Sequence, residues 1–257
     1  MSFRRAQVLV IGDLLLDYQY WVEKFPRAGG DEPILGWRKS LGGSAANTAV
    51  TLASLGVPCL FCGMLGEDEA AGEISAQLES MGIDTSHIQF GISTGYTVTM
   101  IDASGERTMF SYRGASARAP EFTPRLAGAL TDAAVLFLSG YYLLQAKQAR
   151  FVLKAAELAK ASGGLVALDP SPMIGSVAAE VLEPLLAVTD FIFPNKRELR
   201  LLTGVGDEER GIGALLERTK HIVLKLGGGG SRLALRTPAG VRMFAAPAVQ
   251  VAAVDTT

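Results

Sequence analysis

Short apolar segments alternate along this chain with longer segments in which apolar residues recur at helical spacing. The short segments are rich in β-branched and aromatic residues and are apolar on both faces, as in strands of a parallel sheet that is covered on each side. The pattern therefore predicts an α/β fold. The predicted strands are residues 7–13, 58–64, 133–140, 164–170, 190–195, 221–227 and 250–257, and the predicted helices are Ser44–Leu55, Ala70–Ser80, Gln145–Ala161, Val177–Ala187, Lys196–Leu202 and Glu208–Arg218.

Two stretches depart from this alternation. Residues 95–113 alternate apolar and polar side chains on both sides of an Ala-Ser-Gly-Glu turn, which predicts an antiparallel hairpin, and residues 32–40 form a further candidate strand. A half-exposed hairpin does not fit the middle of a doubly wound sheet, so we expect these pieces to form a small second layer that projects as a lid. No repeat, linker or low-complexity segment divides the chain, and residues 1–257 are expected to form a single α/β domain.

Polar side chains follow several of the predicted strands. Asp13 and Asp17 come after the first strand, and Asp169, Asn195 and Asp255 come after later ones. Any one of them is most simply a helix cap or a turn residue. Ligands of open α/β sheets bind outside the carboxyl ends of the strands. Four or five such residues on one edge therefore predict a polar rim that binds hydroxyl groups, a metal ion, or both.

The clearest local feature is a glycine pair, Gly42 and Gly43, followed by a helix of small residues. Ser44 is the expected N-cap and Gly56 the C-terminal stop. Asn47 is the only large polar side chain in the first turn. Paired glycines before a helix let a ligand approach free backbone N–H groups. A capped glycine turn without a ligand explains the same residues about equally well.

A second glycine-rich turn, residues 227–230, follows the predicted strand 221–227. It is either a flexible hairpin or a place where a flat or phosphorylated ligand lies against bare backbone. The chain contains no Walker A motif, and no G-x-G-x-x-G follows its first strand. A bound nucleotide would therefore have to be held by a different sequence motif.

Composition narrows the classes of function. The formal net charge is −2, with no extended basic run, which gives nucleic-acid binding no electrostatic support. No apolar stretch approaches the roughly 20 residues of a membrane-spanning helix, and the apolar N-terminal segment is too short for a signal peptide, so a cytoplasmic location is the default. Cys59 and Cys62 form a C-x-x-C pattern, but their apolar flanks favour a buried strand over a redox or zinc site.

Four segments match, in order, the signatures of one known family. Residues 42–72 are similar to its N-terminal signature, and Asn195–Glu198 match its N-x-x-E motif. Residues 225–230 resemble its nucleotide-side T-L-G-x-x-G turn, and residues 254–257 match the start of its C-terminal signature, D-T-T-G-A-G-D. The chain thus resembles the ribokinase-like (pfkB) carbohydrate kinases over essentially its whole length. The resemblance implies a three-layer fold with a mostly parallel central sheet between helices, plus a small β lid.

The resemblance also implies an activity, the transfer of the γ-phosphoryl group of ATP to a sugar hydroxyl in the presence of Mg²⁺. The lid would consist of segments near residues 17–40 and 95–113, would close over the sugar, and would form a homodimer contact. The residues implied for sugar binding are Asp17, Gly42, Gly43 and Asn47; those for the nucleotide and Mg²⁺ are Asn195, Glu198, Lys225, Gly227 and Gly230, with Glu198 next to the metal; and those for a monovalent cation such as K⁺ are Asp255 and the carbonyl of Thr257.

Several departures from the family limit what it implies. The family's catalytic base and anion hole come from the G-A-G-D segment, which this sequence does not contain, so no catalytic residue is assigned and the C-terminal part of the domain is expected to be missing. Lys225 stands where ribokinases usually have threonine, and Asp169 precedes Pro-Ser-Pro-Met where many relatives carry Asn and Arg.

The substrate class stays open between ribose-type, fructose-type and 2-keto-3-deoxygluconate-type sugars. The Lys-Leu-Gly turn and residues 105–117 resemble the 2-keto-3-deoxygluconate kinase branch, in which Arg107, Tyr112 and Arg113 would face an acidic sugar. A solvated hairpin with a cation–aromatic contact is the preferred interpretation of those three residues.

Two other functions fit the same sequence. A nucleoside kinase of the same fold is one, because Trp21, Phe25 and Trp37 offer stacking surfaces. A truncated, non-catalytic protein that binds a sugar or a nucleotide is the other, because it would keep the sugar pocket and lack the base and anion hole.

Overall fold

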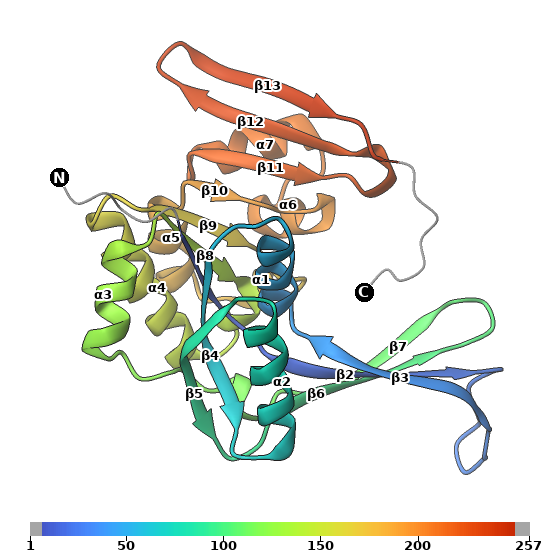
Figure 1. The fold of residues 1–257 in the computed structure, drawn as a ribbon. Coiled ribbons are helices and arrows are strands. Elements are labelled where there is room, and N and C mark those ends of the chain that lie inside the picture. The colour runs from blue at the N-terminus through green and yellow to red at the C-terminus, as the bar shows by residue number, and fades with distance from the viewer. Residues whose placement is uncertain (1–6, 250–257) are drawn as a thin grey trace.

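The computed structural model of the protein describes residues 7–249 and places a nine-stranded main sheet between two layers of helices (Figure 1). The strand order is β13-β12-β11-β10-β9-β8-β1-β4-β5. The seven neighbouring strands β11, β10, β9, β8, β1, β4 and β5 are parallel. Strands β12 and β13 are added antiparallel at the β11 edge. This confirms the predicted α/β fold. The strands are β1 (Val8–Ile11), β4 (Cys59–Gly66), β5 (Asp84–Gly91), β8 (Val135–Ser139), β9 (Leu165–Asp169), β10 (Phe191–Ile192), β11 (His221–Lys225), β12 (Ser231–Thr237) and β13 (Gly240–Ala246).

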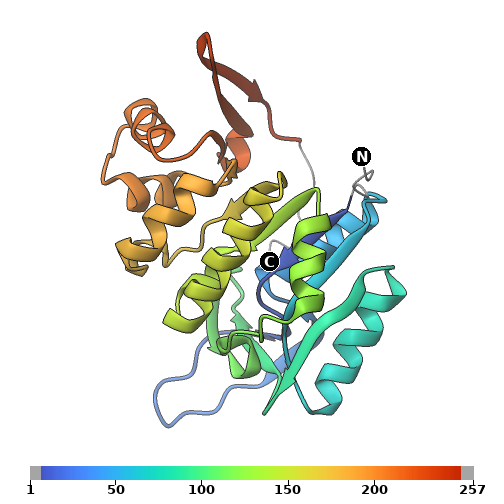
Figure 2. The same cartoon turned by 90° about the vertical axis from the view of Figure 1, so that its left-hand side faces the viewer.

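Each face of the main sheet has its own hydrophobic cluster. Leu9 and Ile11 of β1 pack with residues of α3 to α7, whereas Val10, between them, packs with residues of α1 and α2. Alternate strand residues point to opposite faces, which explains why the strands are apolar throughout. Figure 2 shows helices of the face that is covered by α3 to α7. The helices are α1 (Ser44–Ser54), α2 (Glu69–Ser80), α3 (Pro124–Asp132), α4 (Ala146–Ala161), α5 (Ala179–Val188), α6 (Lys196–Thr203) and α7 (Glu208–Leu216). None of these helices combines the length and apolar character needed to cross a bilayer.

The predicted elements agree with the structure apart from four that were not predicted, namely α3, β5, β13 and β2, and one segment that the structure does not describe. Helix α3 was not predicted, although Thr123 caps it through the backbone N–H of Leu126 and Pro124 stands in its first turn, which are ordinary helix-start signals. Strands β5 and β13 were also not predicted. The turn at residues 227–230 joins the antiparallel pair β11 and β12, as the hairpin interpretation expected. The predicted strand 250–257 lies outside the described residues.

The two cysteines are buried strand residues, as their apolar flanks indicated. Cys59 and Cys62 lie in β4 on opposite faces of the sheet, each in a different hydrophobic cluster. Both are free thiols. Burial raises the pKa of each thiol to about 12, so neither forms a reactive thiolate near neutral pH.

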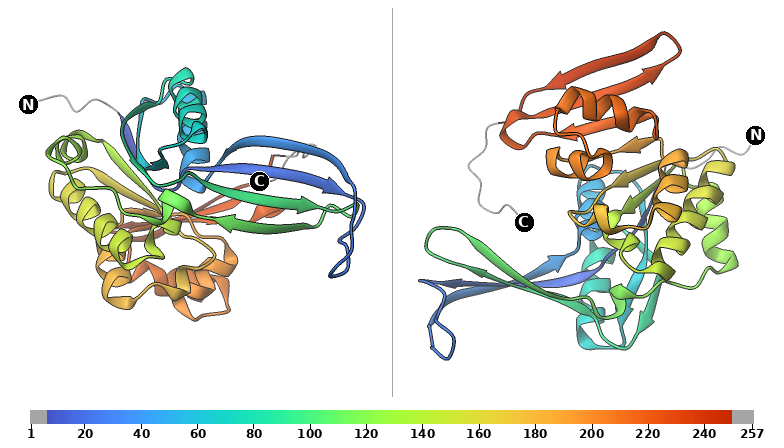
Figure 3. Two further views of the ribbon diagram at one scale, coloured as in Figure 1. Left: turned by 90° about the horizontal axis from the view of Figure 1, so that it is seen from below. Right: turned by 180° about the vertical axis from the view of Figure 1, so that it is seen from behind.

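A second, four-stranded sheet projects from the main domain (Figure 3). Its order is β3-β2-β6-β7, with β2 and β6 parallel and the outer pairs antiparallel. The predicted hairpin is β6 (Gly95–Ile101) and β7 (Arg107–Tyr112), and the predicted strand near Ile34 is β3 (Ile34–Gly42). Strand β2 (Leu15–Val22) was not predicted, because Asp17, Tyr18 and Gln19 interrupt its apolar pattern.

Candidate active site

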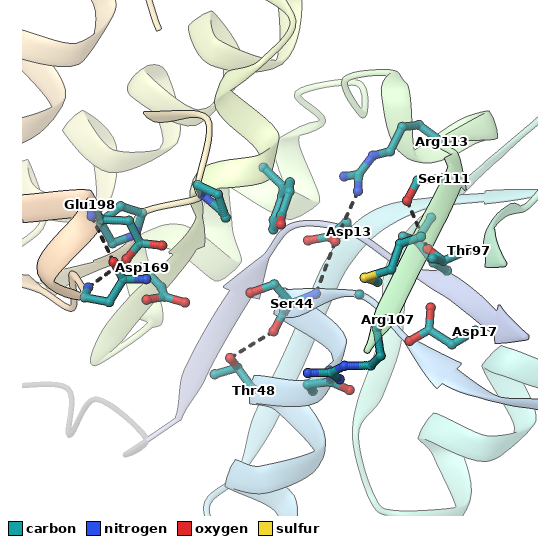
Figure 4. Close-up of a pocket in the computed structure, with 18 of the residues that line it drawn as sticks. Asp13, Asp17, Ser44, Thr48, Thr97, Arg107, Ser111, Arg113, Asp169 and Glu198 are labelled. Atoms are coloured by element: carbon teal, nitrogen blue, oxygen red, sulfur yellow. Dashed lines mark hydrogen bonds and ion pairs between the residues drawn. The ribbon is translucent and has the colours of Figure 1, made fainter. Parts of the chain in front are cut away.

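A cavity of about 1250 Å³ lies between the carboxyl edge of the main sheet and the projecting sheet (Figure 4). Its wall combines the ends of β1 and β9, the first two turns of α1, the start of α6 and one face of the projecting sheet. The structure thus gathers at one place residues that are far apart in the sequence. Six of the predicted site residues line this cavity: Asp17, Gly43, Asn47, Arg107, Asn195 and Glu198.

The turn before α1 is built differently from the prediction. Gly43, not Ser44, occupies the N-cap position, with φ 104° and ψ 132°, and no side chain of the helix caps it. The carboxylate of Asp13 accepts instead from the backbone N–H groups of Ser44 at 3.1 Å and Ala45 at 3.4 Å. A Cβ at position 43 would lie 2.4 Å from the carbonyl oxygen of Asp13, so the close approach of β1 and α1 requires glycine.

Asp17 lies within β2 of the projecting sheet and not at the end of β1, where the sequence pattern had put it. Its side chain nevertheless lines the cavity. Burial raises the pKa of Asp17, a hydrogen bond with Thr97 lowers it by less, and the nearby Asp13 raises it further. The partly buried carboxylate is therefore an acceptor that a ligand with adjacent hydroxyl groups can satisfy.

Gly42 sets the position of the Asp17 carboxylate, although it does not itself line the cavity. A Cβ at position 42 would lie 2.3 Å from Cγ of Asp17 and 2.4 Å from both of its oxygens. Gly36, in the same strand, has only the Trp21 ring at 3.9 Å.

We expect Gly42→Ala to lower kcat/KM for the sugar that the family resemblance implies as substrate by about 100-fold, because a shift of about 1 Å in a ligand-positioning group has that effect. Steady-state kinetics with Gly36→Ala as the matched control checks this. Equal activities of the two variants would contradict the role of Gly42.

The first two turns of α1 present a row of polar side chains to the cavity. Ser44, Asn47, Thr48 and Thr51 line it, which is the spacing of one helix face. The hydroxyls of Thr48 and Thr51 donate to the carbonyls of Ser44 and Asn47, one turn back. Asn47 is the largest of these four side chains and the only one with an amide group.

At the other end of the cavity, Asn195 and Glu198 form a capping box at the start of α6. Oδ1 of Asn195 accepts from the backbone N–H of Glu198, and Oε2 of Glu198 accepts from the backbone N–H of Asn195, both at 2.8 Å. Burial raises the pKa of Glu198; the Asn195 N–H and Lys225 lower it, and Asp169 raises it again. Both residues therefore have a structural role in addition to any ligand contact.

Lys225, at the end of β11, forms an ion pair with Oδ1 of Asp169, at the end of β9. Burial raises the pKa of Asp169, and the charge of Lys225 opposes that shift. Asp169 lines the cavity and Lys225 does not, so Lys225 is linked to the site by its ion pair with Asp169. Within residues 7–249, no three His, Cys, Asp or Glu side chains cluster as a protein-only metal cage.

The remaining predicted residues lie away from the cavity or outside the described residues. Gly227 and Gly230 have positive φ angles of 57° and 82° and form the β11–β12 turn. A Cβ at position 230 would lie 2.0 Å from the carbonyl oxygen of Ala246, so Gly230 has a structural reason to be glycine. Asp255 and Thr257 lie outside the described residues.

The three residues considered for an acidic sugar have different environments. Arg107 lines the cavity, whereas Tyr112 does not: its hydroxyl lies 2.9 Å from that of Ser93. Arg113 lines the cavity and contacts Asp13 at 3.6 Å. Its cation–aromatic contact is with Tyr141, at 5.2 Å from the ring centroid.

Thr97 and Ser111 of the projecting sheet, which the sequence analysis did not identify, lie on the same face of that sheet as Asp17. Asp17, Thr97 and Ser111 are aligned across β2, β6 and β7. Hydroxyls of Thr97 and Ser111 lie 3.4 Å apart beside the cavity. The alternation of residues 95–113 contained this information, but only the register between strands shows which set faces the ligand.

The fold and the cavity define a doubly wound α/β protein with a candidate small-molecule site at the carboxyl edge of its main sheet, beside a second sheet. Comparison with known proteins identifies the family. The family model described as pfkB family carbohydrate kinase matches residues 5–257, and the chain belongs to that family. It is therefore a carbohydrate kinase, a phosphotransferase with an alcohol group as acceptor.

Individual relatives agree with this assignment. The chain is 30% identical to fructokinase-1 of Oryza sativa subsp. japonica over 267 residues, which cover 100% of this chain and 80% of the rice protein. Ribokinase of Arabidopsis thaliana, solved in complex with ribose and ATP, superposes with a TM-score of 0.82 at 23% identity, covering 97% of this chain and 80% of that one. Ribokinase of Thermotoga maritima gives a TM-score of 0.83 at 25% identity, covering 98% and 81%.

Proposed function

We propose that this carbohydrate kinase transfers the γ-phosphoryl group of ATP to a hydroxyl of a ribose-, fructose- or 2-keto-3-deoxygluconate-type sugar. The observation that carries the proposal is that one cavity holds Asp17 and Asn47 at one end and Asn195 and Glu198 at the other. The similar rice protein is a fructokinase, and the similar Arabidopsis fold was solved with ribose and ATP.

Asp17 and Asn47 have the chemistry to orient a sugar. A carboxylate accepts from two adjacent hydroxyls, and an amide both donates and accepts. Their location on two different elements lets them hold a sugar from two sides. Phosphoryl transfer depends mainly on such alignment and on charge neutralisation.

The residues at the other end fit Mg²⁺ as the cofactor. Glu198 lines the cavity and is joined there by the carboxylate of Asp169, so the donor set is oxygen. Mg²⁺ typically uses one or two carboxylates together with water and substrate phosphates, which agrees with the lack of a three-residue cage among residues 7–249. When bound, the ion would neutralise charge on the nucleotide phosphates. Glu198 would orient it, and Lys225 would hold Asp169.

A kinase assay on the complete gene product tests the function. ADP release would be measured with ribose, fructose, 2-keto-3-deoxygluconate and adenosine, each with ATP and with or without Mg²⁺. Mg²⁺-dependent turnover with one of the sugars is expected. No turnover with any sugar would contradict the proposal, and preference for adenosine would favour a nucleoside kinase. Trp21, Phe25 and Trp37, the stacking candidates, do not line the cavity, which favours the sugars.

Arg107 offers a test of the acidic-sugar branch. We expect Arg107→Met to lower kcat/KM for 2-keto-3-deoxygluconate by about tenfold or more, because it removes a charge-assisted contact, and to change the values for ribose and fructose little. Lys24→Met, which removes an exposed cation from the loop between β2 and β3, is the control. An equal loss of kcat/KM with all three sugars would show that Arg107 does not bind the carboxylate of the acidic sugar.

We also propose that the projecting sheet, near residues 17–40 and 95–113, is a lid and a homodimer contact. Its cavity-facing residues alternate with aromatic and apolar residues on the opposite face. Trp37 and Phe110 are 64% and 63% exposed there, and the rings of Tyr96 and Tyr112 lie 5.4 Å apart. Such a patch is typical of an interaction surface. Sedimentation velocity giving a monomer at micromolar concentration would contradict the dimer.

A further inference from the structure

Asp13 follows β1, a strand near the middle of the main sheet. Its strand, β1, has β4 on one side and β8 on the other, and the helices that cover the two sides lie on opposite faces. The residue is 1% exposed. Its carboxylate accepts from the backbone N–H groups of Ser44 and Ala45 and, at 3.0 Å, from the hydroxyl of Ser139. A buried carboxylate needs such donors, and these three all belong to the main domain.

The fourth partner of Asp13 comes from the projecting sheet. Nη1 of Arg113 lies 3.6 Å from Oδ2 of Asp13, while Nη2 is buried and makes no hydrogen bond. Arg113 follows β7 directly and precedes the short 3₁₀ turn Gly114–Ala117, through which the chain leaves the projecting sheet. A Cβ on Gly114 would lie 2.5 Å from the carbonyl oxygen of Ser93, so this exit is closely packed. Arg113 is thus fixed at the base of the projecting sheet.

The same carboxylate oxygen contacts both bodies that form the sugar end of the cavity. Oδ2 of Asp13 accepts from Ser44, the first residue of α1, and lies next to Arg113 of the projecting sheet (Figure 4). Helix α1 carries Asn47, and the projecting sheet carries Asp17. The distance between these two side chains therefore depends on how the two bodies meet at Asp13.

We propose that Asp13 is a positioning residue for sugar binding. Its carboxylate holds Arg113 and the first turn of α1 in one arrangement, so that Asp17 and Asn47 face the same sugar molecule. The proposal rests on the proposed function, which gives those two residues their sugar contacts. Asp13 lines the cavity but is only 1% exposed, and its oxygens already accept three hydrogen bonds and lie beside Arg113, so we propose that it acts through these neighbours and not through the sugar itself.

Kinetics of Asp13→Asn, Arg113→Met and the double variant test this role. Asparagine keeps one oxygen for the Ser44 N–H and removes the charge beside Arg113, but its NH2 group replaces the oxygen that accepts from Ala45 and Ser139. Arg113→Met removes the charge pair and leaves those hydrogen bonds in place. Each single variant is expected to raise KM for the sugar by about tenfold or more and to leave KM for ATP within about twofold. The double variant is expected to be no worse than either single variant by more than about threefold, because both remove the same contact.

The matched control is Glu73→Gln, which breaks the exposed pair between Lys39 of β3 and Glu73 of α2, a second link between the two bodies. It is expected to leave both KM values unchanged. A merely structural role of Asp13 would change both KM values together and lower the melting temperature, and that result would overturn the proposal. If Asp13→Asn does not fold, Arg113→Met decides: a selective rise in sugar KM supports the proposal, and an unchanged value overturns it.

Failure of the proposed function gives a different result. A wild-type protein that phosphorylates no sugar would overturn the proposed function and this inference with it. A wild-type protein that is active, together with single variants whose sugar KM is unchanged, would overturn this inference alone.

Discussion

Asp17→Asn is expected to lower kcat/KM for the sugar by roughly 100-fold to 10,000-fold while raising the melting temperature at pH 7. The loss follows from the two hydroxyl contacts that the carboxylate would accept, each worth about 1.5–3 kcal/mol as a hydrogen bond to a charged group. The gain follows from burial, which raises the pKa of Asp17 and so works against its ionised form in the folded protein. Sugar kinetics and thermal unfolding of the same preparation check both effects.

The pH dependence of the stability effect has a definite sign. A carboxyl group whose pKa is raised on folding costs stability at pH values above the raised pKa. The stabilisation by Asp17→Asn should therefore be largest near neutral pH. It should shrink as the pH falls through the raised pKa and vanish below the ordinary aspartate pKa, where the group is protonated in both the folded and unfolded states.

Asp68→Asn is the matched control with the opposite sign. Burial alone would raise the pKa of Asp68, but hydrogen bonds from Thr94 and Ala71 outweigh it and lower the pKa. This substitution should lower the melting temperature at neutral pH, and the loss should fade as the pH falls through the lowered pKa. A lower melting temperature for Asp17→Asn at pH 7 would show that its carboxylate holds the fold together and that it is not held there for a ligand.

Glu198→Gln is expected to lower kcat by about 100-fold to 1,000-fold with little loss of stability. Glutamine keeps an oxygen that can accept from the backbone N–H of Asn195, so the capping box survives, but the charge that we propose orients Mg²⁺ is removed. The Mg²⁺ concentration for half-maximal activity should rise. Activity measured over a range of Mg²⁺ concentrations, with melting temperatures alongside, checks this.

Glu198→Ala separates the two roles of this side chain. It removes the charge and the cap together, so it should lose the same activity and also about 1 kcal/mol of stability. Activity that follows stability, with the glutamine variant fully active, would show that Glu198 serves only as a cap.

The sequence was sufficient for most strands of the main sheet and for most helices, because these depend on apolar periodicity within one segment. It was insufficient where a contact joins segments that are far apart. Serine is a typical N-cap residue, and Ser44 was therefore predicted to cap the helix, yet Asp13, 31 residues earlier, supplies the capping oxygens. A positive φ at Gly43 keeps the chain in that arrangement, and only the packing of β1 against α1 reveals it.

The sugar end of the site shows the same limit. Asp17 and Asn47 were found as polar residues after a strand and in the first turn of a helix, and the family resemblance then implied that they bind a sugar. Thr97 and Ser111 line the cavity because of the register between strands, and a shift of one residue in that pairing would turn them to the opposite face. Arg113 was considered as a contact to an acidic sugar or, by preference, as a solvated hairpin cation, and its contact with Asp13 was not predicted. Its link to Asp13 spans 100 residues of chain, and no local pattern encodes such a contact.

The two hydrophobic clusters of the main sheet differ in how much of the chain they need. Among the described residues, the buried members of the cluster beneath α1 and α2 all lie between Val10 and Ile88, whereas those of the opposite cluster extend from Leu9 to Ala234. During synthesis, the ribosome therefore releases everything the first cluster requires long before it completes the second. The part of the chain that carries Asn47 can therefore begin to fold while Asn195 and Glu198, at the other end of the cavity, are still being translated.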